Sequence, residues 1–567
     1  MKRIVLIVCI ALACAGILFA AYQVSAPSTP LSKYVPAGPL LYIEAKDFSS
    51  LLGDWNSSPQ KQQWTQSASY DVFSRSRLFL RLKGASDQFA AAAGLPPDMN
   101  FLSQVSGEHS ALALYDIGKL EFLYITYLPS AKAMETSLWQ SRAKFEPRTA
   151  GGVNFYLRRD PESKREVAFA VSGDYLLLST REDLMAGALQ LMAGKQDRTL
   201  ESEQWWAQST AAAGKPGDLR LVLDLEKLVP NGYFRTYWVQ QNITDLSQYS
   251  AAVSDLFRSS KEYREERVLI RKKEPEQPAA AAGFAAAADL ARLVPDDAGV
   301  YRVAANPSPD ASFALLETKL LAPHLGPAPP SQIAPQVQLT SGEQGGASDL
   351  ETRIDQAPAE RPTAPQSRSA LKGLLDKTPL LASLQVQSTA RDQAGVFIRI
   401  HSAVVLAAAS DWNESSVQSA LADFVRPGLT ASQLGIAWQP RTGYQQLDGL
   451  WPLVASAHGK YLLVSDDPAL MESLLANFTR KSARDPAELI AGFNHHRERA
   501  NFTRFTGFID RPNMIGDGTQ NSERQLQFFS GNMASLSTTL AAVSSEKIEV
   551  REDEGKVRQS IVYEWSQ

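Results

Sequence analysis

The feature that most constrains the fold is an internal repetition. Residues 173–179 read Gly-Asp-Tyr-Leu-Leu-Leu-Ser, and residues 459–465 read Gly-Lys-Tyr-Leu-Leu-Val-Ser, at an offset of 286. Between 173–192 and 459–478, 8 of 20 positions are identical, where unrelated sequences would share roughly one. A match of this extent predicts that one module is present twice in tandem.

The segment after each repeated strand has the pattern of an amphipathic helix. Its apolar residues recur at relative positions 0, 1, 4, 5 and 8, which places them along one side of a helix with about 3.6 residues per turn. They are Leu184, Met185, Ala188, Leu189 and Met192 in the first copy, and Leu470, Met471, Leu474, Leu475 and Phe478 in the second. Each copy is therefore predicted to pack a helix against its sheet.

The repeat also sets the expected domain boundaries. The first copy spans 31–273 and the second spans 289–567, with a linker at 274–288. At the start of the modules the offset is only 259, so the second copy contains a net insertion of 27 residues. A proline-rich segment at about 323–369 is the expected insertion, and its composition predicts an extended or disordered loop.

Local patterns predict an α+β fold with a mostly antiparallel sheet. In the first copy a strand near 40–44 precedes two or three helices, and two β-rich runs at 111–115 and 120–126 flank a turn that contains glycine. A helix is expected near 246–259. Alternating apolar residues between 548 and 565 predict a terminal hairpin with one buried face. Short turns between adjacent strands favour antiparallel pairing with helices packed on the sheet.

The N-terminus has the charge and length of an export signal. Lys2 and Arg3 precede an apolar run at 4–21, which as a helix would be about 27 Å long, close to the roughly 30 Å of a bilayer core. We expect residues 1–30 to be a signal anchor with a transmembrane helix at 4–21, which places the rest of the chain outside the cytoplasm. Two alternatives stay open: a signal cleaved after 24–26, and a lipoprotein modified at Cys14.

Composition excludes two classes of function. Lys and Arg total 57 against 61 Asp and Glu, so the net charge is -4 and the chain has no excess of basic residues for binding nucleic acid. Cys9 and Cys14 are the only cysteines, and both lie in the N-terminal apolar run. The exported part can therefore form neither a disulfide nor a thiolate metal site.

Several short motifs resemble a family of bacterial envelope proteins of unknown function. They are Val-Pro-Ala at 35–37, Tyr-Ile-Glu at 42–44 with Asp-Phe at 47–48, the repeated strand at 174–179, and Leu-Asp-Leu at 223–225. Those proteins have an N-terminal hydrophobic segment and a long α+β body. The resemblance implies the same location and fold class, and it assigns no catalytic, cofactor or metal residue.

Two pairs of residues are the candidates for acid–base or metal chemistry. His495 and His496 are adjacent, but neighbours on a helix point about 100° apart and no third ligand follows at helical spacing, which favours a solvated loop or helix end. Asp224 and Asp510, which pair at the offset of 286, each follow the apolar residues of a strand. Catalysis would need a positioned partner, so we expect each aspartate to cap the following turn.

Two further groups are candidates for binding. Trp64 and the pair Trp205 and Trp206 could stack on a glycan, although tryptophans in apolar helical patterns usually lie in the core. The segment from Lys261 to Lys273 contains many charges of both signs, which favours a solvated helix and strand edge over contact with anionic lipid headgroups.

No set of residues in the sequence matches a known reaction, and no cofactor or metal is expected. The leading hypothesis is a membrane-anchored envelope protein that acts as a non-enzymatic interaction or scaffold module, with envelope proteins as partners. The alternative is a carrier or binder of an apolar ligand such as lipid. A hydrolase of envelope polymers is third. Because the two copies differ most in their first halves, a difference in function is expected there.

Overall fold

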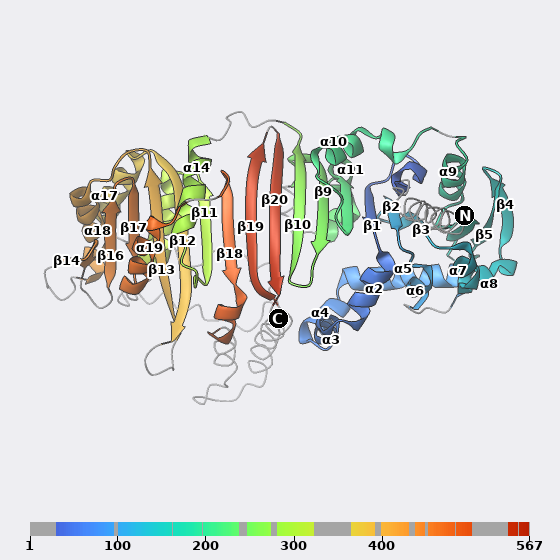
Figure 1. The fold of residues 1–567 in the computed structure, drawn as a ribbon, viewed down its shortest axis with the longest axis horizontal. Coiled ribbons are helices and arrows are strands. Elements are labelled where there is room, and N and C mark those ends of the chain that lie inside the picture. The colour runs from blue at the N-terminus through green and yellow to red at the C-terminus, as the bar shows by residue number, and fades with distance from the viewer. Residues whose placement is uncertain are drawn as a thin grey trace, which may run out of the picture. The chain divides into compact units, whose positions relative to one another are not determined.

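The computed structural model forms two compact units, Met1–Asn56 with Arg77–Val253 and Ser57–Ser76 with Ser254–Gln567 (Figure 1). It describes residues 30–95, 100–161, 163–195, 197–237, 246–273, 281–321, 365–391, 398–429, 437–447, 452–481, 484–501, 543–553 and 555–565. The predicted signal anchor lies outside these residues. Among them, no helix has both the length and the apolar character needed to cross a bilayer.

The first unit is built on an antiparallel sheet in the order β8-β1-β2-β3-β7-β6-β5-β4. The strands are β1 Leu41–Ala45, β2 Ser110–Asp116, β3 Glu121–Tyr127, β4 Glu146–Ala150, β5 Val153–Arg159, β6 Glu166–Ser172, β7 Tyr175–Ser179 and β8 Leu219–Asp224. Two stretches of chain that are far apart in sequence are thus joined in the sheet, because β1 pairs with both β2 and β8.

Helices of the first unit come between these strands. They are η1 Leu31–Tyr34, α2 Phe48–Ser57, α5 Arg77–Ala93, α6 Asn100–Val105, α7 Ser130–Glu135, α8 Ser137–Gln140, η2 Arg142–Lys144, α9 Glu182–Met192, η3 Leu200–Ser202, α10 Gln204–Ala212, α11 Leu225–Leu228 and α12 Gly232–Tyr237. The short helices α3 Pro59–Thr65 and α4 Ala68–Ser74 belong to the second unit. In the predicted strand and helix at 173–192, β7 and α9 have the expected boundaries, and Met185 and Leu189 are fully buried.

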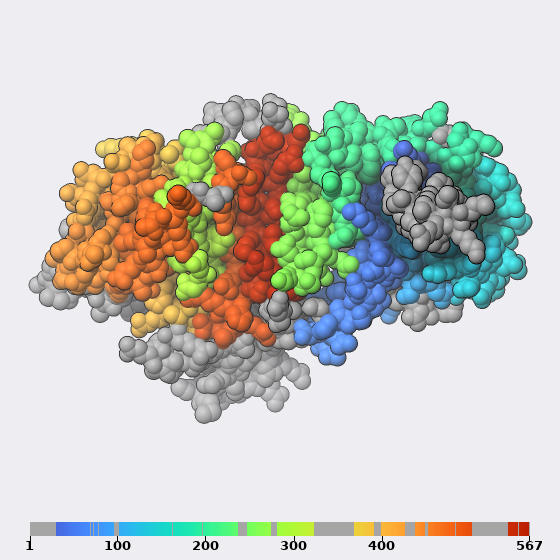
Figure 2. Space-filling view, viewed as in Figure 1, coloured from blue at the N-terminus to red at the C-terminus, as the bar shows by residue number. Residues whose placement is uncertain are grey.

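The second unit is also built on an antiparallel sheet, in the order β10-β20-β19-β18-β11-β12-β13-β17-β16-β15-β14. Figure 2 shows β19 and β20 in red between the green β10 and the orange β18. The strands are β10 Glu262–Arg271, β11 Val300–Ala305, β12 Leu380–Arg391, β13 Ile398–Ala408, β14 Trp438–Arg441, β15 Tyr444–Leu447, β16 Leu453–His458, β17 Tyr461–Ser465, β18 Leu489–Asn494, β19 Val543–Asp553 and β20 Lys556–Trp565. The predicted terminal hairpin is β19 and β20.

Helices of the second unit pack on both faces of this sheet. They are α14 Ala281–Leu290, η4 Ala291–Leu293, α15 Pro309–Leu316, η5 Glu317–Leu321, α17 Pro365–Asp376, α18 Glu414–Leu429, α19 Pro468–Ala476 and η8 Asn477–Thr479. One core joins α14 and α19 to one face, and a second core joins α15, α17 and α18 to the other. The α+β fold with an extensive antiparallel sheet is therefore confirmed.

The order of eight strands is the same in the two units. In the first sheet the neighbouring strands are β8-β1-β2-β3-β7-β6-β5-β4. In the second sheet they are β18-β11-β12-β13-β17-β16-β15-β14, and corresponding strands follow one another in the same order along the chain. Registers correspond as well: Tyr42 lies opposite Ala113, and Tyr301 lies opposite Val386. This correspondence identifies which residue of one unit occupies a given sheet position in the other.

The strand register shows that the prediction of Asp224 and Asp510 as equivalent residues of the two copies is wrong. In the first unit, Asp224 ends the strand that pairs with β1, and the strand that pairs with β11 in the same way ends at Asn494. Asn494 is therefore the residue equivalent to Asp224, and Asp510 lies outside the described residues. The constant offset fails because η3 and α10 separate β7 from β8 by more residues than separate β17 from β18.

Three further expectations differ from the structure. The segment 246–259 forms a strand, β9 Tyr249–Arg258, because its buried residues Ala251 and Val253 alternate with a period of two. The predicted linker at 274–288 contains the start of α14, whose Ala287 and Ala288 are buried in the second unit. Of the predicted loop at about 323–369, residues 323–364 lie outside the described residues, and the remainder belongs to α17, which begins at Pro365, a favourable first helical residue.

Candidate ligand-binding site

One face of the first sheet is apolar but incompletely covered. On the opposite face, Tyr42 and Ala113 are fully buried. On the incompletely covered face, one row of side chains crosses five strands in register and contains only apolar and aromatic residues. The row is Leu221, Ile43, Leu112, Tyr124 and Leu178. All of these except Leu178 are only partly buried, which is unusual for so many neighbouring apolar side chains.

A cavity of about 590 Å³ lies against this face of the sheet. Such a volume is within the roughly 300 to 1,000 Å³ of small-molecule sites. The sheet contributes alternate residues of its strands, and α5 and α6 contribute the other wall. The lining includes Leu41, Ile43, Leu112, Leu114, Phe122 and Tyr124 from the sheet, and Leu82, Ala85, Phe89, Phe101, Leu102 and Val105 from the helices and the end of α6.

Helix α5 covers the cavity unevenly. Near its end, Ala92 and Ala93 are fully buried in a core with Phe169. Near its start, Leu80 and Leu82 are 56% and 50% exposed. Since Leu82 also lines the cavity, the apolar lining reaches the surface at the start of α5.

Tyr124 is the one cavity residue from the central row with a hydroxyl group. Its Oη donates a hydrogen bond of 2.9 Å to the backbone oxygen of Val105. Burial raises the pKa of Tyr124, and hydrogen bonds with Ser110 and Thr126 only partly oppose this effect. The phenol therefore stays neutral, as an apolar ligand would require.

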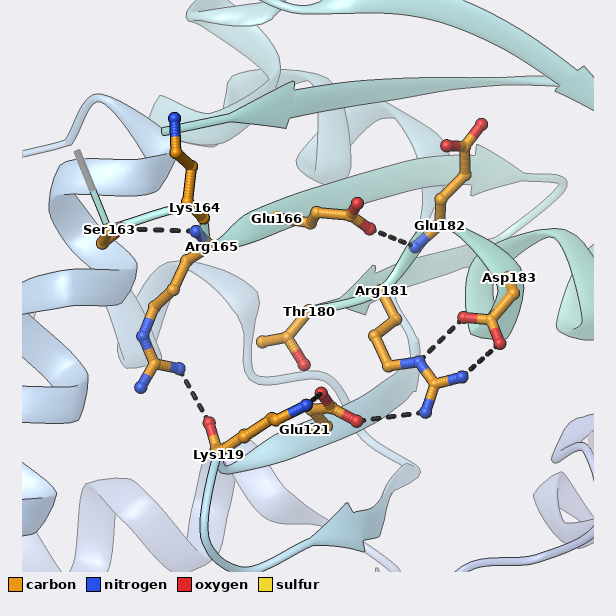
Figure 3. A pocket seen from close by; sticks show the side chains of 10 residues that line it. All are labelled: Lys119, Glu121, Ser163, Lys164, Arg165, Glu166, Thr180, Arg181, Glu182 and Asp183. Carbon is orange, nitrogen blue, oxygen red and sulfur yellow. Dashed lines mark hydrogen bonds and ion pairs between the residues drawn. The ribbon is translucent and has the colours of Figure 1, made fainter. Parts of the chain in front are cut away.

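A charged pocket adjoins the apolar cavity (Figure 3). It is lined by Lys119, Glu121, Ser163, Lys164, Arg165, Glu166, Thr180, Arg181, Glu182 and Asp183. Of these residues, Arg165, Glu166 and Thr180 also line the apolar cavity. The two spaces therefore share a boundary, as the site of an amphipathic molecule would.

The carboxylates of the charged pocket are already paired. Arg181 places its guanidinium between Glu121, at 3.0 Å, and Asp183 (Figure 3). The hydrogen bond with Asp183 is the largest of the effects that raise the pKa of Arg181. Glu166 accepts hydrogen bonds from Nε of Arg159 at 2.8 Å and from the backbone N–H of Glu182 at 2.9 Å.

Arg165 lies where the two spaces meet, and its described partners are uncharged. Its Nε donates to Oε1 of Gln88 on α5 at 2.6 Å, and one terminal nitrogen donates to the backbone oxygen of Lys119 at 2.8 Å. Among the described residues, no carboxylate forms an ion pair with Arg165. Its positive charge is therefore available to a ligand.

The second unit has different residues at the positions of the apolar row. Following the register, the row Leu221, Ile43, Leu112, Tyr124 and Leu178 corresponds to Ala491, Arg302, Gln385, Val404 and Val464. Two of the five positions are strongly polar there, and Val404 and Val464 are fully buried under α17 and α18. The fold itself does not require the apolar cavity, so its lining is a property of the first unit.

A larger cavity of about 1590 Å³ lies on the other face of β1. Its lining contains charges of both signs, including Lys46, Glu108 and Arg220. Glu44 and His109 form a pair within it, with 2.5 Å between Oε1 and Nε2. The pair joins adjacent strands and needs no ligand to explain it.

The structure separates the residues that the sequence suggested for chemistry. Asp224 is 3% exposed and caps α11 by accepting from the backbone N–H of Lys227, as predicted. His495 is half-buried and His496 is exposed, and burial lowers the pKa of His495. Within the described part of the chain, no group of three potential metal ligands occurs.

The residues suggested for binding also have structural roles. Trp205 and Trp206 are 9% and 7% exposed, and the ring of Trp206 packs edge-on against Tyr42 at 4.9 Å. Trp64 contacts Tyr70 and Phe73. Most of the segment from Lys261 to Lys273 is strand β10, in which neighbouring charges of opposite sign pair. Trp206 also lines the larger cavity on the other face of β1.

Sequence reasoning did not identify the cavity or Arg165. The alternation of apolar residues in β1 and β2 was visible, but alternation is equally typical of a filled core. Which helix covers the face, and how closely, depends on contacts between distant segments.

No protein-family model matches the chain, and no curated protein matches it. Two solved structures, crystal forms I and III of TP0453, are similar to part of it. They are 12% and 11% identical, and each alignment covers 44% of this chain. The alignments cover 82% and 84% of the TP0453 chains, both with a TM-score of 0.23.

Proposed function

We propose that the first unit binds an apolar or amphipathic molecule of the lipid class in the cavity between its sheet and α5. The observation that supports this function most directly is that three partly buried residues of the row, Ile43, Leu112 and Tyr124, line a cavity of about 590 Å³. Transfer of a hydrocarbon chain from water into such a site is favourable by about 0.8 kcal/mol per methylene. The scaffold hypothesis stays a prediction, and no contact in the described residues favours it.

The proposal includes a location and an origin. The N-terminal run at 4–21 would anchor the chain in a membrane with both units outside the cytoplasm, close to a source of lipid. The shared strand order and the sequence repeat support a tandem duplication. In this view the second unit retains the fold with a filled core, and the first has the binding role.

A photoactivatable fatty acid tests this function. The full-length chain would be held in an amphipathic polymer, because the chains of a detergent would compete for the cavity. After irradiation, we expect crosslinked peptides from β1, β2, β3 and α5. Crosslinks spread evenly over both units, or none at all, would contradict the proposal.

Variants that copy the second unit provide a sharp control. Leu112→Gln and Leu114→Gln introduce the residues found at the equivalent positions, Gln385 and Gln387. These glutamines are compatible with the strand, so the fold should persist while the cavity becomes polar and crosslinking falls. Met134→Gln, which changes an exposed residue on α7 outside the cavity, should leave crosslinking unchanged.

A further inference from the structure

We propose that Arg165 makes the site selective for molecules that have one apolar chain and an anionic head group. This inference rests on the proposed function and specifies its ligand class. Arg165 lines both the apolar cavity and the charged pocket, so a chain in the cavity would place its head group beside the guanidinium.

The electrostatic surroundings favour an anion at this boundary. The adjacent carboxylate, Glu166, accepts from the backbone N–H of Glu182 (Figure 3). It also accepts from Nε of Arg159. Lys119, whose side chain is 76% exposed, lines the same pocket, and its ammonium forms a long ion pair of 3.8 Å with Glu121. Charge-assisted hydrogen bonds from an arginine to a carboxylate or phosphate are stronger than those between neutral groups.

The second unit has a different residue at the position that Thr180 occupies between the two spaces of the first unit. Its Oγ1 accepts a hydrogen bond of 2.8 Å from the backbone N–H of Phe122. The equivalent residue is Asp466, whose Oδ1 accepts from the backbone N–H of Ser402 at 2.7 Å. The same backbone contact is thus made by a neutral group in the first unit and by an anionic group in the second. Only the neutral group leaves the boundary suitable for an anionic ligand.

Equilibrium binding of hexadecanoate and hexadecanol separates charge selectivity from apolar binding. Both would be measured on the full-length chain in amphipathic polymer at neutral pH. We expect hexadecanoate to bind about tenfold more tightly than hexadecanol, because the guanidinium can form a charge-assisted hydrogen bond with the carboxylate and only a weaker one with the alcohol. Arg165→Gln should reduce this ratio to near one without weakening hexadecanol binding.

Thr180→Asp provides a variant that should fold, because Asp466 makes the equivalent contact. It should lower the affinity for hexadecanoate alone. Lys132→Gln removes an exposed charge on α7 and should leave the ratio unchanged. Equal affinities in the unmodified protein, or a ratio that Arg165→Gln does not alter, would overturn the role of Arg165. Failure of both ligands to bind would instead reject the cavity as a binding site, and the inference with it.

Discussion

The hydroxyl of Tyr461 donates a hydrogen bond of 2.5 Å to Oδ2 of Asp289. Tyr461 belongs to the repeated strand β17, and Asp289 belongs to α14, whose first residues were expected to be linker. Arg292 completes the contact through Oδ1 of the same carboxylate, at 2.7 Å. Helix α14, most of which was expected to belong to the linker, is therefore held against the core of the second unit.

Removal of the Tyr461 hydroxyl tests the strength of this contact. Tyr461→Phe should lower the free energy of unfolding of the second unit by about 1.5 to 3 kcal/mol, as expected for a hydrogen bond to a charged group. Urea denaturation, monitored by the hydrogen exchange of the backbone amides of α14, would measure the change in the free energy of unfolding. Tyr175→Phe is the matched control, because Tyr175 occupies the equivalent position and its ring packs on Tyr34 and Tyr127. A loss of similar size in both variants would argue against the contact.

The same carboxylate predicts a dependence of stability on pH. Burial raises the pKa of Asp289, but hydrogen bonds from Arg292 and Tyr461 outweigh burial and leave the pKa below its ordinary value. A lowered pKa in the folded state gives stability that is present above the unfolded pKa of about 3.9 and is lost as pH falls through the folded pKa. The difference in stability between the unmodified protein and Asp289→Asn should be constant above about pH 5 and should shrink in more acidic solution. A difference that grew on acidification would contradict this assignment.

The cap at Asp224 predicts unequal effects of two substitutions. Asp224→Ala should lower the free energy of unfolding of the first unit by about 1 to 2 kcal/mol, because the backbone N–H of Lys227 loses its acceptor. Asp224→Asn should cost less, since Asn494 makes the same contact with the backbone N–H of Arg497 at 3.0 Å. Thermal unfolding of the two variants would compare them. An equal loss in both would show that the negative charge, which pairs with Lys227 at 2.8 Å, is the larger contribution.

Filling the cavity should change stability and binding in opposite directions. Ala85 lines the cavity on α5, and Ala85→Leu adds three carbon atoms to the empty space. At about 0.8 kcal/mol per buried methylene, the variant should be more stable by up to about 2.4 kcal/mol if all three carbon atoms are buried. The affinity for hexadecanoate should fall because less volume remains. Calorimetric unfolding and ligand titration on the same preparation would check both. Lower stability would mean that the space is smaller than the structure indicates.

The local elements of this fold were largely predictable. The strand and helix at 173–192, the hairpin around Gly118 and the terminal hairpin all follow from the spacing of apolar residues and from turn residues. At 246–259 the sequence was misassigned, because the run contains alanine and leucine that suit a helix as well as a strand. The tertiary structure decides between the two, because β9 buries every second residue between 251 and 255.

The candidate site could not be predicted in the same way. Arg165 lies between Lys164 and Glu166 in a charged stretch at a turn, and nothing in the sequence distinguishes it from its charged neighbours. Its significance comes from Gln88 and the backbone oxygen of Lys119, which are 77 and 46 residues away in sequence. Such contacts are set by the way in which α5 crosses the sheet.

The sequence by itself determined the period of each repeated element and its apolar side, because these depend on neighbours within a few positions along the chain. Tertiary structure alone decided that Asn494 rather than Asp510 corresponds to Asp224, since strand pairing and not a constant offset defines equivalent positions. It also decided that similar sheets support a filled core in one unit and a cavity in the other. The physical reason is that packing density depends on how closely a covering helix approaches the sheet, and that distance is set by side chains far apart in sequence.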